Sequence, residues 1–176
     1  METKITLRPY EPSDANDVFV AVQESMTELS RWMPWCHPGY SYADALSWIR
    51  LTQEGRATGK MYDFGVFDAT GRYVGGCGIT SVNAVERFAN LGYWVRTSRT
   101  GGGLASAAAR DVARWAFANT PLNRLEIVVA VGNVRSERVA LKAGAEREGV
   151  LRQRLVLDGR SRDAHMFSIV RSSSAL

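Results

Sequence analysis

Apolar residues recur along the chain with two periods, and these divide it into expected strands and helices. Alternation, as in Lys4-Ile-Thr-Leu-Arg8, predicts strands, whereas spacings of three and four, as at Val18 and Val22, predict helices. The expected helices span 15–24, 26–32, 41–54, 103–118 and 133–142. The expected strands span 4–8, 61–67, 73–82, 88–95, 124–131, 147–157 and 162–170.

Residues typical of caps and turns separate these segments. Asn133 is positioned to cap the last helix and Gly144 to end it, and Asp158-Gly159 predicts a tight hairpin turn. The glycines within 75–78 indicate close approach of the backbone to a neighbour, or a bulge.

The order of these elements predicts an α+β domain over residues 1–171, with a frayed tail at 172–176. A meander of strands comes first, and a strand–helix–strand crossover follows in the middle of the chain. We therefore expect a mixed, mostly antiparallel seven-stranded sheet flanked by helices.

Composition and charge narrow the function classes. The chain has 176 residues, of which 45% are hydrophobic and 23% charged, as in ordinary soluble domains. It has no apolar run of membrane-spanning length and no signal-peptide pattern, so a cytoplasmic protein without a membrane partner is expected. The net charge of +4 comes from scattered arginines and demands no nucleic-acid partner. Two histidines and two cysteines, Cys36 and Cys77, predict neither a metal site nor a disulfide.

The most informative segment is Arg99-Thr-Gly-Gly-Gly-Leu-Ala-Ser106, between an expected strand and an expected helix. Consecutive glycines leave the backbone N–H groups accessible, and the first N–H groups of a helix lack internal partners. Together with the helix dipole, these donors predict a site for an anion, most often a phosphate.

Two common phosphate motifs do not fit this segment. A Walker loop ends in Gly-Lys-Ser/Thr, but Leu104 follows Gly103 here. The dinucleotide pattern GxGxxG is only half matched, because position 106 is Ser. A nucleotide triphosphatase and a nucleotide-dependent oxidoreductase are therefore disfavoured.

In several segments the chain resembles the GNAT N-acetyltransferases, particularly the branch of ribosomal-protein N-terminal acetyltransferases. The resemblance covers nearly the whole chain. It rests on Leu7-Arg-Pro9, Gly92-Tyr-Trp-Val95, Gly101-Gly-Gly-Leu-Ala105, Asn133-Val-Arg-Ser136 with Gly144, and Glu148-Gly-Val-Leu-Arg152. In the family motif Gln/Arg-x-x-Gly-x-Gly/Ala, the first position falls on Thr100, a departure, and the last two on Gly103 and Ala105.

This resemblance implies that acetyl-CoA is the cosubstrate and that its pyrophosphate lies on the glycine loop. The backbone at Val95 and Arg96 is expected to pair with the pantetheine arm like an added strand, and Asn133 to hydrogen-bond the cofactor or only cap its helix. The implied cofactor-binding residues are Val95, Arg96, Arg99, Thr100, Gly101, Gly102, Gly103, Leu104, Ala105, Ser106 and Asn133.

The resemblance also implies direct attack of an amine on the thioester. Many members place a Tyr acid seven residues after the motif Asn, but that position is Ala140 here. Ser136 lies one turn earlier and is the implied proton donor to the thiolate, unless it is only a solvated helix residue. The branch's usual acidic residue is replaced by Asn90, which cannot accept a proton at neutral pH. Glu28, His37 and Glu86 are alternative bases.

The acceptor side is less defined by the sequence. Trp32, Trp35 and His37 lie where the family shapes its acceptor groove, and with Asn90 they are the expected substrate-binding residues. A protein N-terminus, another peptide, a polyamine and an aminoglycoside-like antibiotic all stay open as acceptors. An acyl-CoA sensor without turnover is the alternative to an enzyme, and a homodimer is expected from the family.

Overall fold

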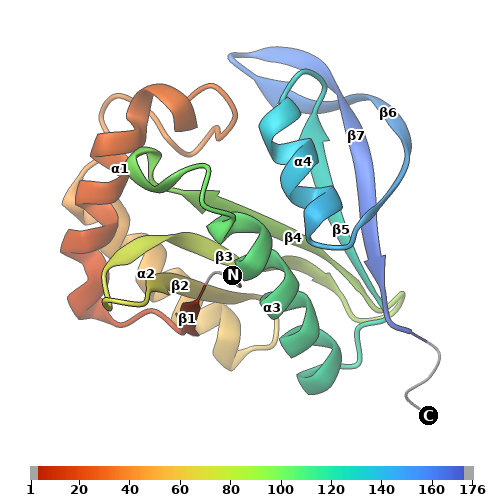
Figure 1. Ribbon diagram of the computed structural model, residues 1–176, viewed down its shortest axis with the longest axis horizontal. Coiled ribbons are helices and arrows are strands. Elements are labelled where there is room, and N and C mark those ends of the chain that lie inside the picture. Colours follow the sequence, from red (N-terminus) through yellow and green to blue (C-terminus); the bar gives the residue numbers. More distant parts are fainter. Residues whose placement is uncertain (1–3, 173–176) are drawn as a thin grey trace.

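The computed structural model describes residues 4–172. A seven-stranded sheet forms its centre, with the spatial order β1-β2-β3-β4-β5-β7-β6 (Figure 1). Every neighbouring pair is antiparallel except β4 and β5, which are parallel. The strands are β1 (Ile5–Arg8), β2 (Tyr62–Asp68), β3 (Tyr73–Asn83), β4 (Phe88–Val95), β5 (Arg124–Ala130), β6 (Glu146–Leu157) and β7 (Arg160–Val170). The expected fold class is confirmed.

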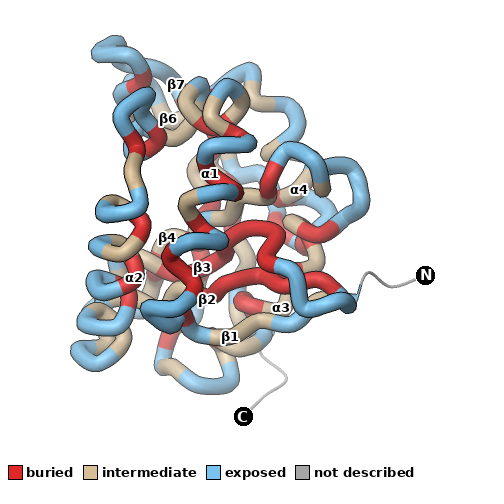
Figure 2. The backbone as a smooth tube through the Cα atoms, turned by 90° about the vertical axis from the view of Figure 1, so that its left-hand side faces the viewer, coloured by how far each residue is buried: buried red, intermediate tan, exposed pale blue. Residues whose placement is uncertain are grey.

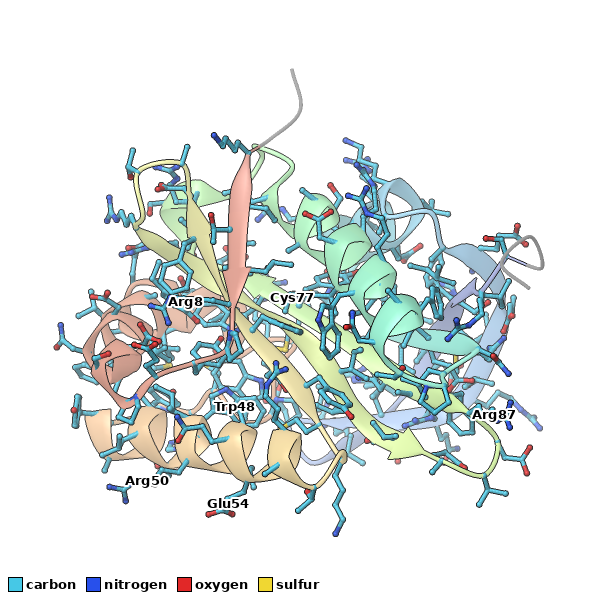
Figure 3. All side chains as sticks on the ribbon, turned by 90° about the horizontal axis from the view of Figure 1, so that it is seen from below. Arg8, Trp48, Arg50, Glu54, Cys77 and Arg87 are labelled. Carbon is cyan, nitrogen blue, oxygen red and sulfur yellow. The ribbon has the colours of Figure 1, made fainter. Side chains whose placement is uncertain are left out.

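Helices cover both faces of the sheet, and α2 and α3 lie on opposite sides of it (Figure 3). The helices are α1 (Ala15–Leu29), α2 (Tyr42–Ala57), α3 (Leu104–Asn119) and α4 (Val134–Lys142), and the short 3-10 turns are η1 (Pro12–Asp14) and η2 (Thr97–Arg99). Two groups of buried apolar side chains result, one between α3 and the sheet and one beneath α1 and α2. Figure 2 shows how fully the central strands β2 and β3 are buried. None of the helices within 4–172 is long and apolar enough to cross a membrane.

One helical prediction is wrong. The expected helices 15–24 and 26–32 are the single helix α1, which ends at Leu29. No Gly or Pro interrupts the chain between them, and Ser25 is buried with the apolar face of α1. Its hydroxyl accepts a hydrogen bond from the Thr97 amide at 2.9 Å, so tertiary contacts favour continuation of the helix there.

The predicted turns are confirmed. Asp158 and Gly159 both have positive φ angles, 50° and 69°, as a tight two-residue hairpin turn requires. Gly144, which follows the C-cap residue Ala143 of α4, has a φ of 95°, as is typical of the residue that ends a helix. Cys36 and Cys77 are both buried and free. The predicted tail, apart from Ser172, lies outside the described residues.

The glycines of β3 confirm the predicted close approach of the backbone. A Cβ added to Gly75 would lie 2.1 Å from the Trp94 carbonyl oxygen, and one on Gly78 would lie 2.2 Å from Asp63 Oδ1. Because real Cβ atoms do not approach other atoms so closely, β3 accepts no side chain at these positions.

Candidate active site

Strands β4 and β5 separate soon after they meet. Their pairing covers only Phe88–Asn90 against Arg124–Glu126, whereas β4 continues beside β3 up to Val95. In a strand, the main-chain groups of successive residues point to opposite neighbours. Since the Arg96 amide donates to the Val74 carbonyl in β3 at 2.8 Å, the main-chain groups of Tyr93 and Val95 point into the gap.

Of the two residues predicted to pair with the pantetheine arm, Val95 and Arg96, this geometry leaves Val95 with main-chain groups that face the gap. The Arg96 amide is already used toward β3. Its side chain is buried, pairs with the Glu24 carboxylate of α1, and donates to the Tyr73 carbonyl at 3.2 Å. Arg96 therefore has a structural role, which the sequence pattern does not indicate.

Helix α1 fixes the segment between β4 and the glycine loop. Glu24 Oε1 accepts from the Ser98 amide at 2.9 Å, and Ser25 Oγ accepts from the Thr97 amide at 2.9 Å. The guanidinium of Arg96 lowers the pKa of Glu24 to about 2. Sequence reasoning missed Glu24, because its partners follow more than 70 positions later in the chain.

The glycine loop leads into the N-terminus of α3 as predicted. Gly101 and Gly103 adopt positive φ angles of 86° and 77°, and Gly103 takes the N-cap position without a side-chain cap. The first amides of α3, those of residues 104–106, therefore point from the helix end toward the exposed loop. Together with the helix dipole, this arrangement suits an anionic group.

The two side chains before the glycines are directed elsewhere. Arg99 forms an ion pair of 2.7 Å with Asp68. The Thr100 hydroxyl donates to the Thr97 carbonyl at 3.0 Å. Both side chains are therefore engaged within the protein, and main-chain groups are what this loop offers to an anion.

Across the gap, Tyr93 of β4 reaches Ser136 of α4. The Tyr93 hydroxyl donates to the Ser136 carbonyl at 2.9 Å and lies 3.1 Å from Ser136 Oγ. Burial raises the pKa of Tyr93 to about 12, so this hydroxyl is neutral at physiological pH. Asn133 caps α4, accepting from the Ser136 amide at 3.2 Å, and Ala140 is fully buried. Ser136 is thus placed at the gap, and Ala140 brings no hydroxyl there.

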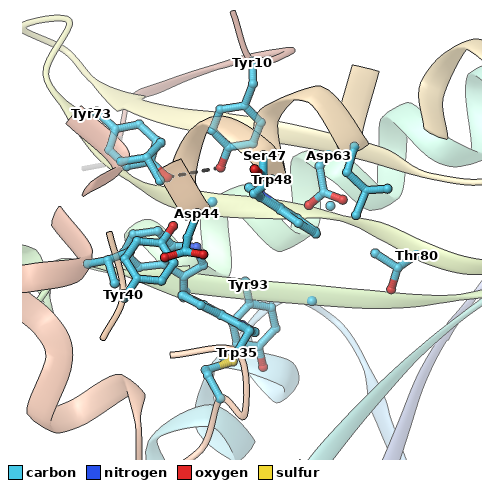
Figure 4. Close-up of a pocket in the computed structure, with 18 of the residues that line it drawn as sticks. Tyr10, Trp35, Tyr40, Asp44, Ser47, Trp48, Asp63, Tyr73, Thr80 and Tyr93 are labelled. Carbon is cyan, nitrogen blue, oxygen red and sulfur yellow. Dashed lines mark hydrogen bonds between the residues drawn. The ribbon is translucent and has the colours of Figure 1, made fainter. Parts of the chain in front are cut away.

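On the other side of β4, a cavity of about 580 Å³ opens between the sheet, α2 and the loop after α1 (Figure 4). Aromatic side chains form a large part of its apolar walls, and the rings of Trp35 and Trp94 lie 6.0 Å apart. The predicted Trp35, His37 and Asn90 all line it. The other aromatic residues of its walls are Tyr10, Tyr40, Trp48, Tyr73 and Tyr93.

Three of the residues considered at the sequence level are not among those lining the cavity. Trp32 instead lies beside Arg31, whose guanidinium carbon is 5.7 Å from the ring centroid. Glu28 faces Arg135 at 3.6 Å on the surface, and Glu86 is exposed in the turn between β3 and β4. Of the alternative bases, only His37 lines the cavity.

The cavity contains a carboxylate that sequence reasoning missed. Asp63 of β2 lines it, and its Oδ2 atom is buried without a hydrogen-bond partner. Burial raises the pKa of Asp63 to about 7, although the positive charge of Arg56 acts in the opposite direction. Arg56 donates to the main-chain oxygen of Asp63 at 3.1 Å. A lone Asp in a strand gives no sequence signal of this kind.

Comparison of the chain with known proteins points to one family. The family model of the acetyltransferase (GNAT) domain matches residues 4–146. The "Putative ribosomal N-acetyltransferase YdaF" of Bacillus subtilis is 29% identical over 174 residues, covering 95% of this chain and 91% of that protein.

Solved structures agree. The Mycobacterium smegmatis RimJ structure, a complex with CoA-disulfide, has a TM-score of 0.87 and 28% identity, with 98% of this chain and 84% of that chain covered. The microcin C7 self-immunity acetyltransferase MccE, in complex with acetyl-CoA and AMP, has a TM-score of 0.90 over 97% and 94% of the two chains. At 21% identity it shows a shared fold.

The chain therefore belongs to the GNAT acetyltransferase family. It is an acetyl-CoA-dependent N-acetyltransferase, so the expected enzyme class and cosubstrate are confirmed.

Proposed function

We propose that the enzyme acetylates a primary amine held in the aromatic cavity, with acetyl-CoA lying in the gap between β4 and β5. The observation that carries this proposal is the position of β4 between the two spaces. Its unpaired edge at Tyr93 and Val95 faces the gap, and Gly92 and Trp94 line the cavity. An amine in the cavity and a thioester in the gap would thus meet at this strand.

The residues present suit the pantetheine arm and the pyrophosphate. The main chain of Val95 offers the arm a strand edge. The amides of residues 104–106, at the uncapped start of α3, suit the pyrophosphate. Asn133, which caps α4, also hydrogen-bonds the cofactor in this proposal.

Acetyl-CoA supplies an activated acetyl group, and the protein supplies orientation and hydrogen bonds. The amine nitrogen attacks the thioester carbon while a main-chain N–H of β4 polarises the carbonyl. As the carbon–sulfur bond breaks, Ser136 donates a proton to the leaving thiolate, and the Tyr93 hydroxyl at 3.1 Å holds its Oγ in place. The attacking nitrogen loses one proton to solvent water, and a proton from water restores the Ser136 hydroxyl, so the products are the acetylated amine and the free CoA thiol.

Two acceptor classes have support. The Bacillus subtilis relative, a putative ribosomal N-acetyltransferase by name, favours a ribosomal acceptor. The size and aromatic walls of the cavity favour a small amine with an apolar body. A cytoplasmic location and a homodimer stay predictions.

Release of free CoA thiol tests the proposed function. The purified protein is mixed with acetyl-CoA and a panel of amines that includes N-terminal peptides, polyamines, arylalkylamines and aminoglycosides. Thiol release with at least one amine, and acetylation of that amine in the mass spectrum, is the expected result. Tight acetyl-CoA binding without thiol release from any amine would instead favour the sensor.

A further inference from the structure

The carboxylate of Asp63 and the gap are joined by a row of residues without side chains. In the register of the sheet, Asp63 of β2 lies opposite Gly78 of β3, and Gly78 lies opposite Gly92 of β4. All three residues line the cavity. A Cβ added to Gly78 would lie 2.2 Å from Asp63 Oδ1, so the carboxylate itself lies over Gly78. Since neighbouring strands are about 4.8 Å apart, the carboxylate is about one strand spacing from Gly92 of β4.

The protein does not satisfy this carboxylate itself. Its Oδ2 atom is buried without a hydrogen-bond partner, and no ion pair joins the carboxylate to any residue within 4–172. The nearest cation, Arg56, binds the main-chain oxygen, and its guanidinium carbon lies 4.6 Å from the centre of the Phe64 ring. A buried carboxylate in this state is unfavourable unless a ligand pairs with it.

The surroundings of Asp63 favour a cation as that ligand. Asp63, Trp48, Ser47 and Thr80 line the same cavity (Figure 4). Aromatic rings and a carboxylate together recognise an ammonium group by cation–π attraction and charge-assisted hydrogen bonds. The other carboxylate lining the cavity, Asp44, is already held by Ser41 in the cap of α2.

We propose that Asp63 binds the second ammonium group of a compact diamine, whose other amine is acetylated at β4. The apolar body of the acceptor then lies over Gly92 between the aromatic walls, with its second ammonium group at the Asp63 carboxylate over Gly78. This proposal rests on the proposed function and names its substrate class. Asp63 is accordingly a specificity residue, because it touches the end of the substrate that does not react.

A matched pair of amines tests the assignment. The amines 4-(2-aminoethyl)benzylamine and 4-methylphenethylamine share one arylethylamine end and differ at the other by a single ammonium group. For the unmodified enzyme, kcat/KM for the diamine is expected to exceed that for the monoamine at least tenfold, because a buried polar group discriminates strongly against a substrate that leaves it unpaired.

The variant Asp63→Asn keeps the shape of the side chain and removes its charge. It is expected to lower kcat/KM for the diamine at least tenfold, to leave the monoamine within about threefold, and so to abolish the preference. The control Glu54→Gln removes a charge from the exposed face of α2, where Glu54 points away from the sheet in Figure 3. This control should keep the preference.

Two results would overturn the proposal. One is an unchanged preference in Asp63→Asn. The other is an equal loss of kcat for both amines, which would make Asp63 a proton acceptor or a structural residue.

A binding measurement separates this proposal from the proposed function. Quenching of tryptophan fluorescence by the diamine, with CoA present, reports binding without turnover, because Trp35, Trp48 and Trp94 line the cavity. If no amine releases thiol, the proposed function fails. Tighter diamine binding by the unmodified protein than by Asp63→Asn would still support the ammonium site, and equal binding would refute it.

Discussion

The hydroxyl groups of Tyr93 in β4 and Ser136 in α4 lie 3.1 Å apart. The Tyr93 hydroxyl donates to the Ser136 carbonyl at 2.9 Å, and either hydroxyl can donate in the contact between them. Burial keeps Tyr93 neutral by raising its pKa to about 12. In the proposed mechanism this pair supplies an uncharged hydroxyl donor one helical turn before Ala140, which stands at the position of the family's usual tyrosine.

Replacing Ser136 tests this donor. Ser136→Ala is expected to lower the rate of acetyl transfer in a single turnover by about 100-fold, in line with loss of a general acid. Tyr93→Phe should have a smaller effect, because it removes only the group that orients Ser136. An unchanged single-turnover rate in Ser136→Ala would remove Ser136 from the mechanism.

The buried charge of Asp63 predicts a pH-dependent stability. Its pKa of about 7 in the folded protein lies above the ordinary value of 3.8, so between these values the folded state retains a proton that the unfolded state has lost. The free energy of unfolding therefore falls as the pH rises from about 4 to 7, by up to roughly 4 kcal/mol for this group.

Asp63→Asn removes this penalty. The variant should unfold at a higher temperature than the unmodified protein at pH 8, and the difference should shrink at pH 4. Thermal unfolding followed by circular dichroism at both pH values measures it. A destabilised variant at pH 8 would show that the carboxylate is paired in the free protein.

Gly78 makes room for Asp63, and a side chain there should be harmful. The added Cβ of Gly78→Ala would lie 2.2 Å from Asp63 Oδ1 and 2.6 Å from the Asp63 Cα atom, so side chain and backbone must both move. We expect a loss of about 1–3 kcal/mol in denaturant unfolding. Gly149→Ala is the matched control, because nothing lies within 4 Å of its added Cβ. Equal stabilities of the two variants would contradict the close contact.

The contacts of Glu24 predict a role for α1 in cofactor binding. Glu24→Gln weakens the pairing with Arg96 and the hydrogen bond to the Ser98 amide, which together hold the segment before the glycine loop. The KM for acetyl-CoA should rise several-fold with little change in kcat. Asp17→Asn, an exposed substitution on the same helix, is the control and should leave KM unchanged. A change in kcat alone would argue against this role.

Local patterns predicted much of the fold. The turn at Asp158-Gly159 and the end of α4 at Gly144 depend on backbone preferences that single residues reveal, and both are confirmed. The glycine loop was likewise readable, because its glycines adjoin the start of a helix. The split of α1 into two helices was wrong, since the pattern does not show that Ser25 bonds to a segment far along the chain.

The parts of the site that the sequence did not predict depend on long-range pairing. Asp63 matters because it lies opposite Gly78, a register that no local pattern contains. Arg96 follows a strand and resembles an exposed cofactor contact, but its partner Glu24 buries it. Both cases join a charged residue to a neighbour that only the tertiary structure supplies.

The short contact between β4 and β5 has a mechanical consequence. The unit formed by β5, β7 and β6 joins the rest of the sheet through only three residue pairs, beginning at Phe88 and Arg124. Beyond these pairs, the two parts are held together by side-chain contacts such as the one between Tyr93 and Ser136. A molecule bonded to the edge of β4 and to α4 would brace the two parts against each other. The two parts of the sheet would then be held more rigidly in the cofactor-bound enzyme than in the free enzyme.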